Sequence, residues 1–179
     1  RMEISSLDRP PKEFIYISRH QLKLKTDRIF KCVEKLTIEQ IWSRTHNTEN
    51  SVGNLIHHLS GSIQQWVLSG IEGRPNKRNR DEEFERRKPI PTDELLKRLS
   101  ETVSQADRVL ENLTAPELLS ERKVKFYDVT VLEAIYHVVD HLSGHTGQII
   151  WATKRMTGES LGFSSSLTRD NASDSIRSC

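Results

Sequence analysis

The 179-residue chain lacks the features that mark several classes of protein. Its two cysteines, Cys32 and Cys179, are too few for a framework of disulfides. No apolar run approaches the roughly 18 residues that a membrane-spanning helix needs, and the N-terminus carries no signal-peptide pattern. The 27 basic and 25 acidic side chains leave a net charge of only +2, which gives no footprint for nucleic acid. These absences predict a cytoplasmic protein that binds neither nucleic acid nor a membrane.

The composition favours one helical domain. A chain of this length fits a single domain of ordinary size. Hydrophobic residues make up 35% and charged residues 29%, which suits helices with wet outer faces around one narrow core. Part of the apolar deficit lies in a Ser-rich C-terminal stretch. We therefore expect the domain over residues 1–160 and a polar, disordered tail over residues 161–179.

Apolar residues recur at helical spacing along four stretches of the chain, which predicts four helices. These helices cover about residues 11–32, 50–70, 92–112 and 130–156. Asn50 or Ser51 can cap the second helix and Thr92 the third, while Thr130 and Glu133 form a capping box at the start of the fourth. We therefore expect an all-α protein, a four-helix bundle with a long loop between its second and third helices.

The connections between these helices carry weaker patterns. Residues 37–42 and 114–119 each predict one helical turn, and residues 123–127 alternate as a short strand would. A single short strand without a clear partner does not make a sheet. The loop over residues 71–91 is dense in charge and long for a compact domain, so we expect it to be functional or partly ordered, with a helical turn at residues 80–87.

Histidines on two of the predicted helices are candidates for a metal site. His141 and His145 are one turn apart and share one border of the fourth helix's apolar face, with His137 further out as a weaker candidate. On the second helix His58 flanks the apolar face and His57 faces solvent, so His58 is the one that can reach into the bundle. Three imidazoles from two facing helices would leave coordination positions open, as catalytic zinc sites do.

Two interpretations of these histidines compete. A histidine at the border of an apolar face is most often a hydrogen-bonded residue at the edge of the core. A pair spaced one turn apart is a modest motif on its own, because such pairs also occur on solvated faces. A third histidine at the matching border of another helix favours a metal site, but the pattern leaves both interpretations open.

Three segments of the chain resemble the DinB/YfiT-like proteins, and most of all a branch of that family without an assigned function. They are residues 50–66, which contain His58, the charged residues 78–84, and residues 141–149, which contain His141 and His145. The segments occur in the family's order, and the resemblance runs over about residues 11–158. It implies a four-helix bundle, often dimeric, that holds a divalent metal such as zinc or nickel.

The resemblance also implies which residues bind the metal. The family's second-helix ligand maps to His58, and its last-helix pair maps to His141 and His145. The residue before His58 is more often apolar in such proteins, and here it is His57. Three imidazoles suit zinc, nickel, copper or iron.

Characterised relatives in the resembled family include thiol-dependent S-transferases and a thiol-dependent isomerase, so a low-molecular-weight thiol is implied as a possible cofactor. A divalent ion with a vacant position can activate a bound water or a thiol. We expect a metal-dependent enzyme of the thiol S-transferase or hydrolase type that acts on a small molecule as a homodimer. The alternatives are a non-catalytic stress-response or structural bundle, in which the metal is incidental or stabilising, and a partner-binding module that uses the charged loop.

Two polar residues near these histidines are candidates to support the ligands. Gln148 is one turn past His145, and Asn54 is one turn before His58. Either amide could hydrogen-bond a ligand or a bound water. An ordinary contact at a helix border is the alternative role for each of them.

The sequence shows no general base next to the histidines, because no Glu follows the first His as in H-E-x-x-H. Asp81 or Glu83 could supply one if the charged loop folds over the site. A solvated, salt-bridged loop is the favoured interpretation. We expect Trp66 and Trp151 to be core or interface residues rather than to stack on a substrate.

Overall fold

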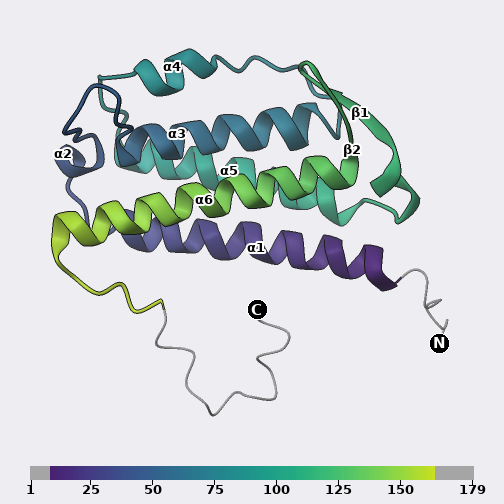
Figure 1. Cartoon of the computed structure of the whole chain (residues 1–179), viewed down its shortest axis with the longest axis horizontal. Coiled ribbons are helices and arrows are strands. Elements are labelled where there is room, and N and C mark those ends of the chain that lie inside the picture. The colour runs from purple at the N-terminus through teal and green to yellow at the C-terminus, as the bar shows by residue number, and fades with distance from the viewer. Residues whose placement is uncertain (1–8, 164–179) are drawn as a thin grey trace, which may run out of the picture.

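Four long helices pack as a bundle in the computed structural model, which describes residues 9–163 (Figure 1). They are α1 (Arg9–Val33), α3 (Val52–Ile63), α5 (Thr92–Glu111) and α6 (Val131–Thr157). The smaller helical elements are α2 (Ile38–Ile41), a π-helical segment (Gln64–Ser69) that continues α3, α4 (Arg80–Glu85) and a 3-10 turn (Pro116–Leu119). The predicted four-helix bundle is confirmed. None of the helices in residues 9–163 combines the length and the apolar character that crossing a membrane requires.

Side-chain caps set where two of these helices begin. Thr130 and Glu133 form the predicted capping box, since the Thr130 hydroxyl accepts from the Glu133 amide (3.2 Å) and the Glu133 carboxylate accepts from the Thr130 amide (2.7 Å). Ser51 caps α3 through its side chain. The prediction of Thr92 as a cap is wrong, because Thr92 is the first residue of α5 and the preceding Pro91 offers no side-chain acceptor.

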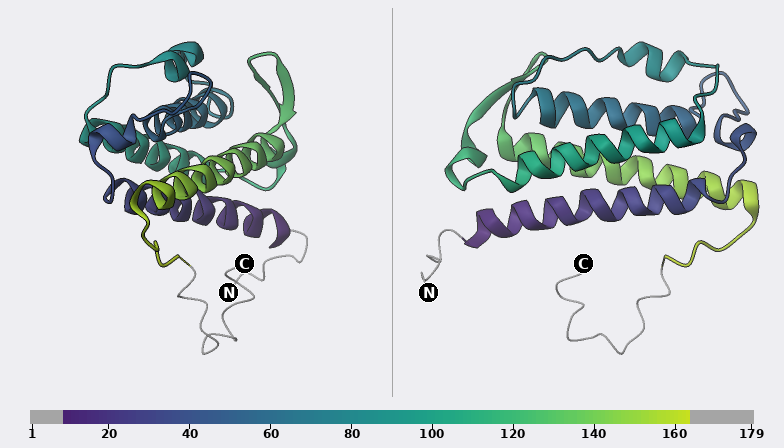
Figure 2. Two further views of the ribbon diagram at one scale, coloured as in Figure 1. Left: turned by 60° about the vertical axis from the view of Figure 1, so that its left-hand side comes forward. Right: turned by 180° about the vertical axis from the view of Figure 1, so that it is seen from behind.

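The helices form layers because each buries its apolar face. α1 packs against α5 and α6, and α3 packs against the same two helices. α4 contacts the outer side of α3, so every residue of α3 is buried (Figure 2). The largest fully buried side chains come from all four long helices; they include Leu22, Ile29, Ile56, Leu59, Leu95, Leu99, Ile135 and Leu142. Cys32 belongs to this core.

A small hairpin replaces the lone extended piece expected over residues 123–127. Strand β1 (Glu121–Val124) pairs antiparallel with β2 (Tyr127–Thr130), and a two-residue turn joins them. Lys125 adopts a left-handed φ of 60° in that turn, as tight hairpin turns require. Val124 anchors the hairpin in the core. The prediction that the strand has no partner is wrong, because the partner directly precedes the start of α6 and its sequence merges with the capping box.

The end of α6 leads into the segment predicted to be a disordered tail. Gly158 ends the helix with a left-handed φ of 71°. Leu161 and Phe163 then pack against the core. The remainder of the predicted tail, residues 164–179, lies outside the described residues.

Candidate metal centre

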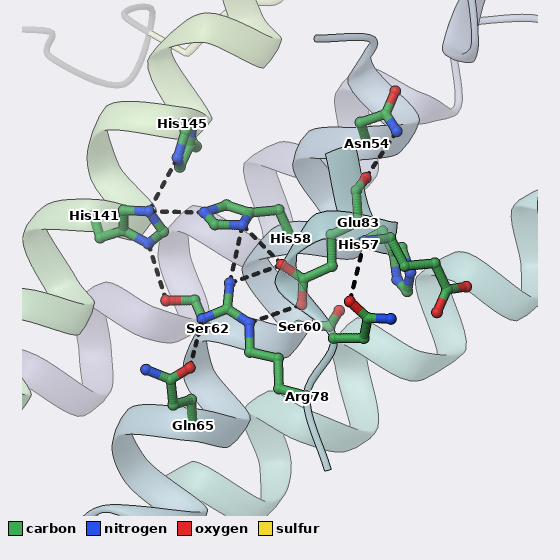
Figure 3. Close-up of polar contacts among 12 residues, drawn as sticks. Asn54, His57, His58, Ser60, Ser62, Gln65, Arg78, Glu83, His141 and His145 are labelled. Carbon is green, nitrogen blue, oxygen red and sulfur yellow. Dashed lines mark hydrogen bonds and ion pairs between the residues drawn. The ribbon is translucent and has the colours of Figure 1, made fainter. Parts of the chain in front are cut away.

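Three histidines from two helices meet at one point beside the core. His58 comes from α3, and His141 and His145 come from successive turns of α6 (Figure 3). The Nε2 atoms of His58 and His141 are 3.0 Å apart, and those of His141 and His145 are 3.1 Å apart. The three ligand atoms all lie within 4.8 Å of one another, so the group could hold a metal ion. We call these three residues the histidine cluster.

An oxygen atom lies beside the other ring nitrogen, Nδ1, of each imidazole in the cluster. The pairs are His58 with Glu83 Oε2 (3.0 Å), His141 with Ser62 Oγ (3.3 Å) and His145 with Gln148 Oε1 (2.9 Å). The Ser62 hydroxyl can either donate or accept, and Arg78 Nη2 also lies 3.0 Å from His58 Nδ1. The Glu83 carboxylate and the Gln148 amide oxygen can only accept a hydrogen bond, so they favour the tautomer with the proton on Nδ1 of His58 and His145. That tautomer turns the Nε2 lone pair toward the other histidines, as a metal ligand requires.

Glu83, which touches His58, belongs to a buried ion pair with Arg78. Arg78 donates from Nε to Oε1 (2.8 Å) and from Nη2 to Oε2 (2.7 Å), and the two side chains are only 5% and 4% exposed. Burial alone would raise the pKa of Glu83, but the hydrogen bonds from Arg78 and His58 outweigh it and lower the pKa. Glu83 therefore stays ionised and fixes the orientation of the His58 ring.

Close approach of Glu83 to α3 depends on a glycine. A Cβ at Gly61 would collide with the Glu83 carboxylate. The hydroxyl of Ser62 on the same turn reaches His141. Small side chains on this side of α3 thus let the charged segment after the π-helical turn settle directly on the helix.

Asn54 and Arg44 tie the backbone around Glu83 to α3. The Asn54 amide donates to the carbonyls of Glu83 (2.8 Å) and Arg86 (3.2 Å), and Arg44 donates to the carbonyl of Phe84 (2.9 Å). Arg44 also bonds the side-chain oxygen of Asn54. Asn54, considered above as a support for a ligand, therefore acts on the segment that carries Glu83 and not on a histidine directly.

Burial keeps two of the cluster histidines neutral. It lowers the pKa of His58 below the ordinary value for histidine. Burial, with the charges of His145 and His58, lowers the pKa of His141 to about 3. Neutral imidazole is the form that binds a metal. The buried ring of His58 and the half-buried ring of His141 therefore present the ligating form at neutral pH without having to lose a proton.

A cavity of about 400 Å³ adjoins the histidine cluster. His58, Ser62 and His141 contribute to one wall. Arg78 and Arg80 line it from the segment around α4, and the turn and second strand of the hairpin line it from another side. In the left-hand view of Figure 2 the hairpin and α4 stand on opposite sides of the bundle's upper surface.

Comparison with known proteins identifies a family. Residues 10–169 match DUF1572, a family described as protein of unknown function. The chain belongs to this family. Among solved structures, one described as the conserved protein of a locus from Enterococcus faecalis superposes with a TM-score of 0.64 at 16% identity, covering 80% of this chain and 97% of that chain. At that identity the similarity shows a shared fold for the DUF1572 chain and nothing more. No curated protein matches it.

The prediction that His57 faces solvent is wrong for this DUF1572 chain. His57 is only 5% exposed, and Arg98 Nη1 lies 3.3 Å from its Nδ1. The cause is the charged loop, which covers the outer side of α3. The favoured interpretation of that loop as solvated is wrong for Glu83, which is buried, and holds for Asp81, which is exposed.

His137 and the two tryptophans take separate positions in the DUF1572 fold. His137 lies outside the cluster, with its ring 4.0 Å from that of Trp66 and stacked on His141 at 5.6 Å. Trp66 is buried, as expected of a core residue, and it also lines the cavity. Trp151 is 60% exposed near the end of α6, with the Arg155 guanidinium 5.4 Å from its ring.

Sequence reasoning misses three residues of this site in the DUF1572 chain: Arg78, the hydroxyl of Ser62, and the positioning role of Glu83. One available signal is the composition of α3. Outside its apolar stripe α3 carries small residues, Gly61 on the opposite side and Ser60 and Ser62 on the flanks, in place of the charged residues of a solvated helix. Such a face indicates that another segment covers the helix.

Proposed function

We propose that this DUF1572 protein is a divalent-metal-dependent enzyme of the thiol S-transferase or hydrolase type. His58, His141 and His145 would hold the ion, with zinc or nickel as the preferred metals. The observation that carries the proposal is the convergence of three Nε2 atoms while each Nδ1 faces an oxygen. Carboxylate and amide partners of this kind accompany metal-binding histidines.

The contacts within the cluster support an ion rather than a network of hydrogen bonds. His141 Nε2 lies 3.0 Å from one Nε2 and 3.1 Å from another. A neutral imidazole nitrogen carries either one proton or one lone pair, so His141 can satisfy only one of these two contacts. One cation satisfies all three nitrogens, and tetrahedral zinc with bonds of roughly 2.0–2.1 Å separates its nitrogen ligands by about 3.3 Å.

The donor set suits the proposed chemistry. A divalent ion held by three neutral imidazoles supplies Lewis acidity, which lowers the pKa of a thiol or water that it binds. Glu83 accepts a hydrogen bond from His58 Nδ1 and orients that ring. Because both Glu83 oxygens are engaged by Arg78 and His58, Glu83 serves as a positioning residue and not as a general base.

Two further elements of the proposal rest on the resemblance to the DinB/YfiT-like proteins. That resemblance supports the same three ligands, a low-molecular-weight thiol as cofactor, and a homodimer. The agreement between its ligand pattern and the cluster geometry is what favours an enzyme of this type. The substrate in this proposal is a small molecule, because a cavity of about 400 Å³ adjoins the cluster.

A stabilising metal in a non-catalytic bundle is the second candidate function. The cluster joins α3 to α6, so an ion there would cross-link two helices of the bundle. In that case removal of the metal would lower the melting temperature, and no thiol-transfer or hydrolytic reaction would depend on the ion.

Metal analysis of protein purified without a histidine tag tests the proposal. We expect about one zinc or nickel ion per chain, and loss of that ion in His58→Ala. His137→Ala is the matched control, because His137 is on the same helix as two of the ligands but outside the cluster. Equal metal content in parent and His58→Ala would refute the ligand assignment. A scan of thiol acceptors and hydrolysable esters with metal-loaded and metal-stripped protein then separates the enzyme from the stabilised bundle.

A further inference from the structure

The cavity beside the histidine cluster is lined by positive charge. Arg78, Arg80 and Lys125 contribute to its walls, and no Asp or Glu of the described chain does. The Arg78 charge is offset by its bidentate pair with Glu83. Two uncompensated cations therefore remain at the cavity, one from each side of it.

The two uncompensated cations, Arg80 and Lys125, each lie over an aromatic ring. The Arg80 guanidinium lies 5.1 Å from the centre of the Phe84 ring, and the Lys125 ammonium lies 5.5 Å from that of Phe126. Among residues 9–163, neither cation has a carboxylate within ion-pairing distance. Both thus keep their full charge for a ligand.

The rest of the lining offers flat apolar surface. The Tyr127 ring stacks at 5.9 Å on Trp66, which is 8% exposed and also contacts His137 at 4.0 Å. Tyr127 is 56% exposed and presents its ring to the cavity. Phe126, at the turn of the hairpin, is 81% exposed and also borders it. Ring faces of this kind pack against planar apolar groups.

We propose that the cavity binds a small molecule that combines an anionic group, a phosphate or a carboxylate, with an aromatic or flat apolar body. The anionic group lies between Arg80 and Lys125, and the body packs on Phe126 and Tyr127. The reacting group then faces the histidine cluster. This inference rests on the proposed metal-dependent function, because it assigns the substrate class of that site.

Binding to metal-free protein tests the inference without any enzymatic readout. The probes are phenyl phosphate, benzoate and the neutral benzyl alcohol, titrated by calorimetry at low ionic strength. We expect at least one anionic probe to bind roughly tenfold more tightly than benzyl alcohol, and added salt to reduce that difference. Comparison of the two anions tells a phosphate site from a carboxylate site.

Two charge-removing variants locate the anion. Arg80→Gln and Lys125→Asn should each weaken the anionic probe by roughly two- to fivefold and leave benzyl alcohol unchanged. Asn is chosen at position 125 because it tolerates the left-handed backbone there. Lys123→Gln, which removes one charge from the same hairpin outside the cavity, is the matched control and should change nothing. Phe126→Ala should weaken charged and neutral probes alike.

Three outcomes overturn the inference: no saturable binding of either anion, equal affinity for anion and alcohol, or the same loss in Lys123→Gln as in the cavity variants. The metal content of the same preparations is measured separately. Anion binding by protein that holds no metal as purified, and that takes up neither zinc nor nickel when these are supplied, would defeat the proposed enzymatic function and leave the anion site standing. A bound metal with no anion preference would defeat only the substrate assignment.

Discussion

Helices α1 and α3 border the same core, but they differ in how many of their polar side chains are buried. α1 spans 25 residues, of which seven are buried, and its outer face lies open to water. α3 spans 12 residues, and all of them are buried, including Asn54, His57 and His58. A buried polar group must find a partner within the protein, because leaving it unpaired costs free energy. α1 therefore contributes mainly apolar packing, whereas the polar residues of α3 find partners in the segment around α4, on α5 and on α6.

The largest expected loss of stability comes from removing the ion pair that holds the segment around α4 on α3. Arg78→Met leaves the buried Glu83 carboxylate without its cation and should lower the free energy of unfolding by about 3–5 kcal/mol. Urea denaturation followed by circular dichroism measures it. Lys88→Met, an exposed charge in the same loop, is the control and should stay within roughly 0.5 kcal/mol of the parent. The double variant Arg78→Met/Glu83→Leu should recover most of the loss; failure to recover it would contradict the buried-pair explanation.

A core truncation in α1 sharpens the contrast. Leu22 is fully buried, and Leu22→Ala should lower the free energy of unfolding by about 2–5 kcal/mol through a cavity in the core. The metal content of the folded fraction should not change, because α1 contributes no residue to the histidine cluster. A loss of metal from folded Leu22→Ala protein, measured by elemental analysis after gel filtration, would show that the two regions are not separable.

A variant at the edge of the site should have the opposite effect to Leu22→Ala, because it should weaken metal binding without changing stability. Gln148 is exposed, and its amide oxygen accepts from His145 Nδ1. Gln148→Ala should therefore weaken metal binding by about tenfold, while the free energy of unfolding changes by less than roughly 0.5 kcal/mol. Competition with a chromogenic chelator measures the affinity. Gln105→Ala on α5, remote from the cluster, should leave that affinity at the parent value.

The smallest effect belongs to the open face of α1. Arg19 forms a bidentate pair with Asp107 at 2.7 and 2.9 Å, and its hydrogen bond lowers the pKa of Asp107. Because the pKa is lower in the folded state, the pair stabilises the protein at pH values above the unfolded-state pKa of about 4. That stabilisation is lost as the pH falls through the folded-state pKa. Asp107→Asn should thus cost less than about 1 kcal/mol near neutral pH and nothing in strong acid. Unfolding curves of the two proteins that fail to converge in acid would contradict the assignment.

The bundle could be predicted because the sequence patterns that specify its helices are local. Helical periodicity and the Thr130–Glu133 capping box depend on residues a few positions apart. The same spacing places His141 and His145 on one face of a helix. Strand β2 escapes prediction because its four residues run directly into that capping box.

The positioning residues of the site could not be predicted in the same way. The place of Glu83 depends on where a long charged loop settles, and composition alone favours water for such a loop. What decides the outcome is a contact between distant residues: Gly61 leaves the space, and Asn54 supplies hydrogen-bond donors for the carbonyls of that loop. The helical wheel selects His58 for the cluster, but it places His57 in solvent because it does not include the loop that covers that side of α3.

The bridge from His58 through Glu83 to the segment around α4 makes two equilibria inseparable. Local opening of residues 78–86 would remove the carboxylate that orients His58, so the open form would hold a cation at the proposed site less tightly. By thermodynamic reciprocity, a cation on the cluster must then suppress that opening by the same factor. Amide hydrogen exchange in residues 78–86 would consequently slow as the histidine cluster binds a cation. Exchange in this segment would then report how much of the site is occupied, although the segment contributes no ligand.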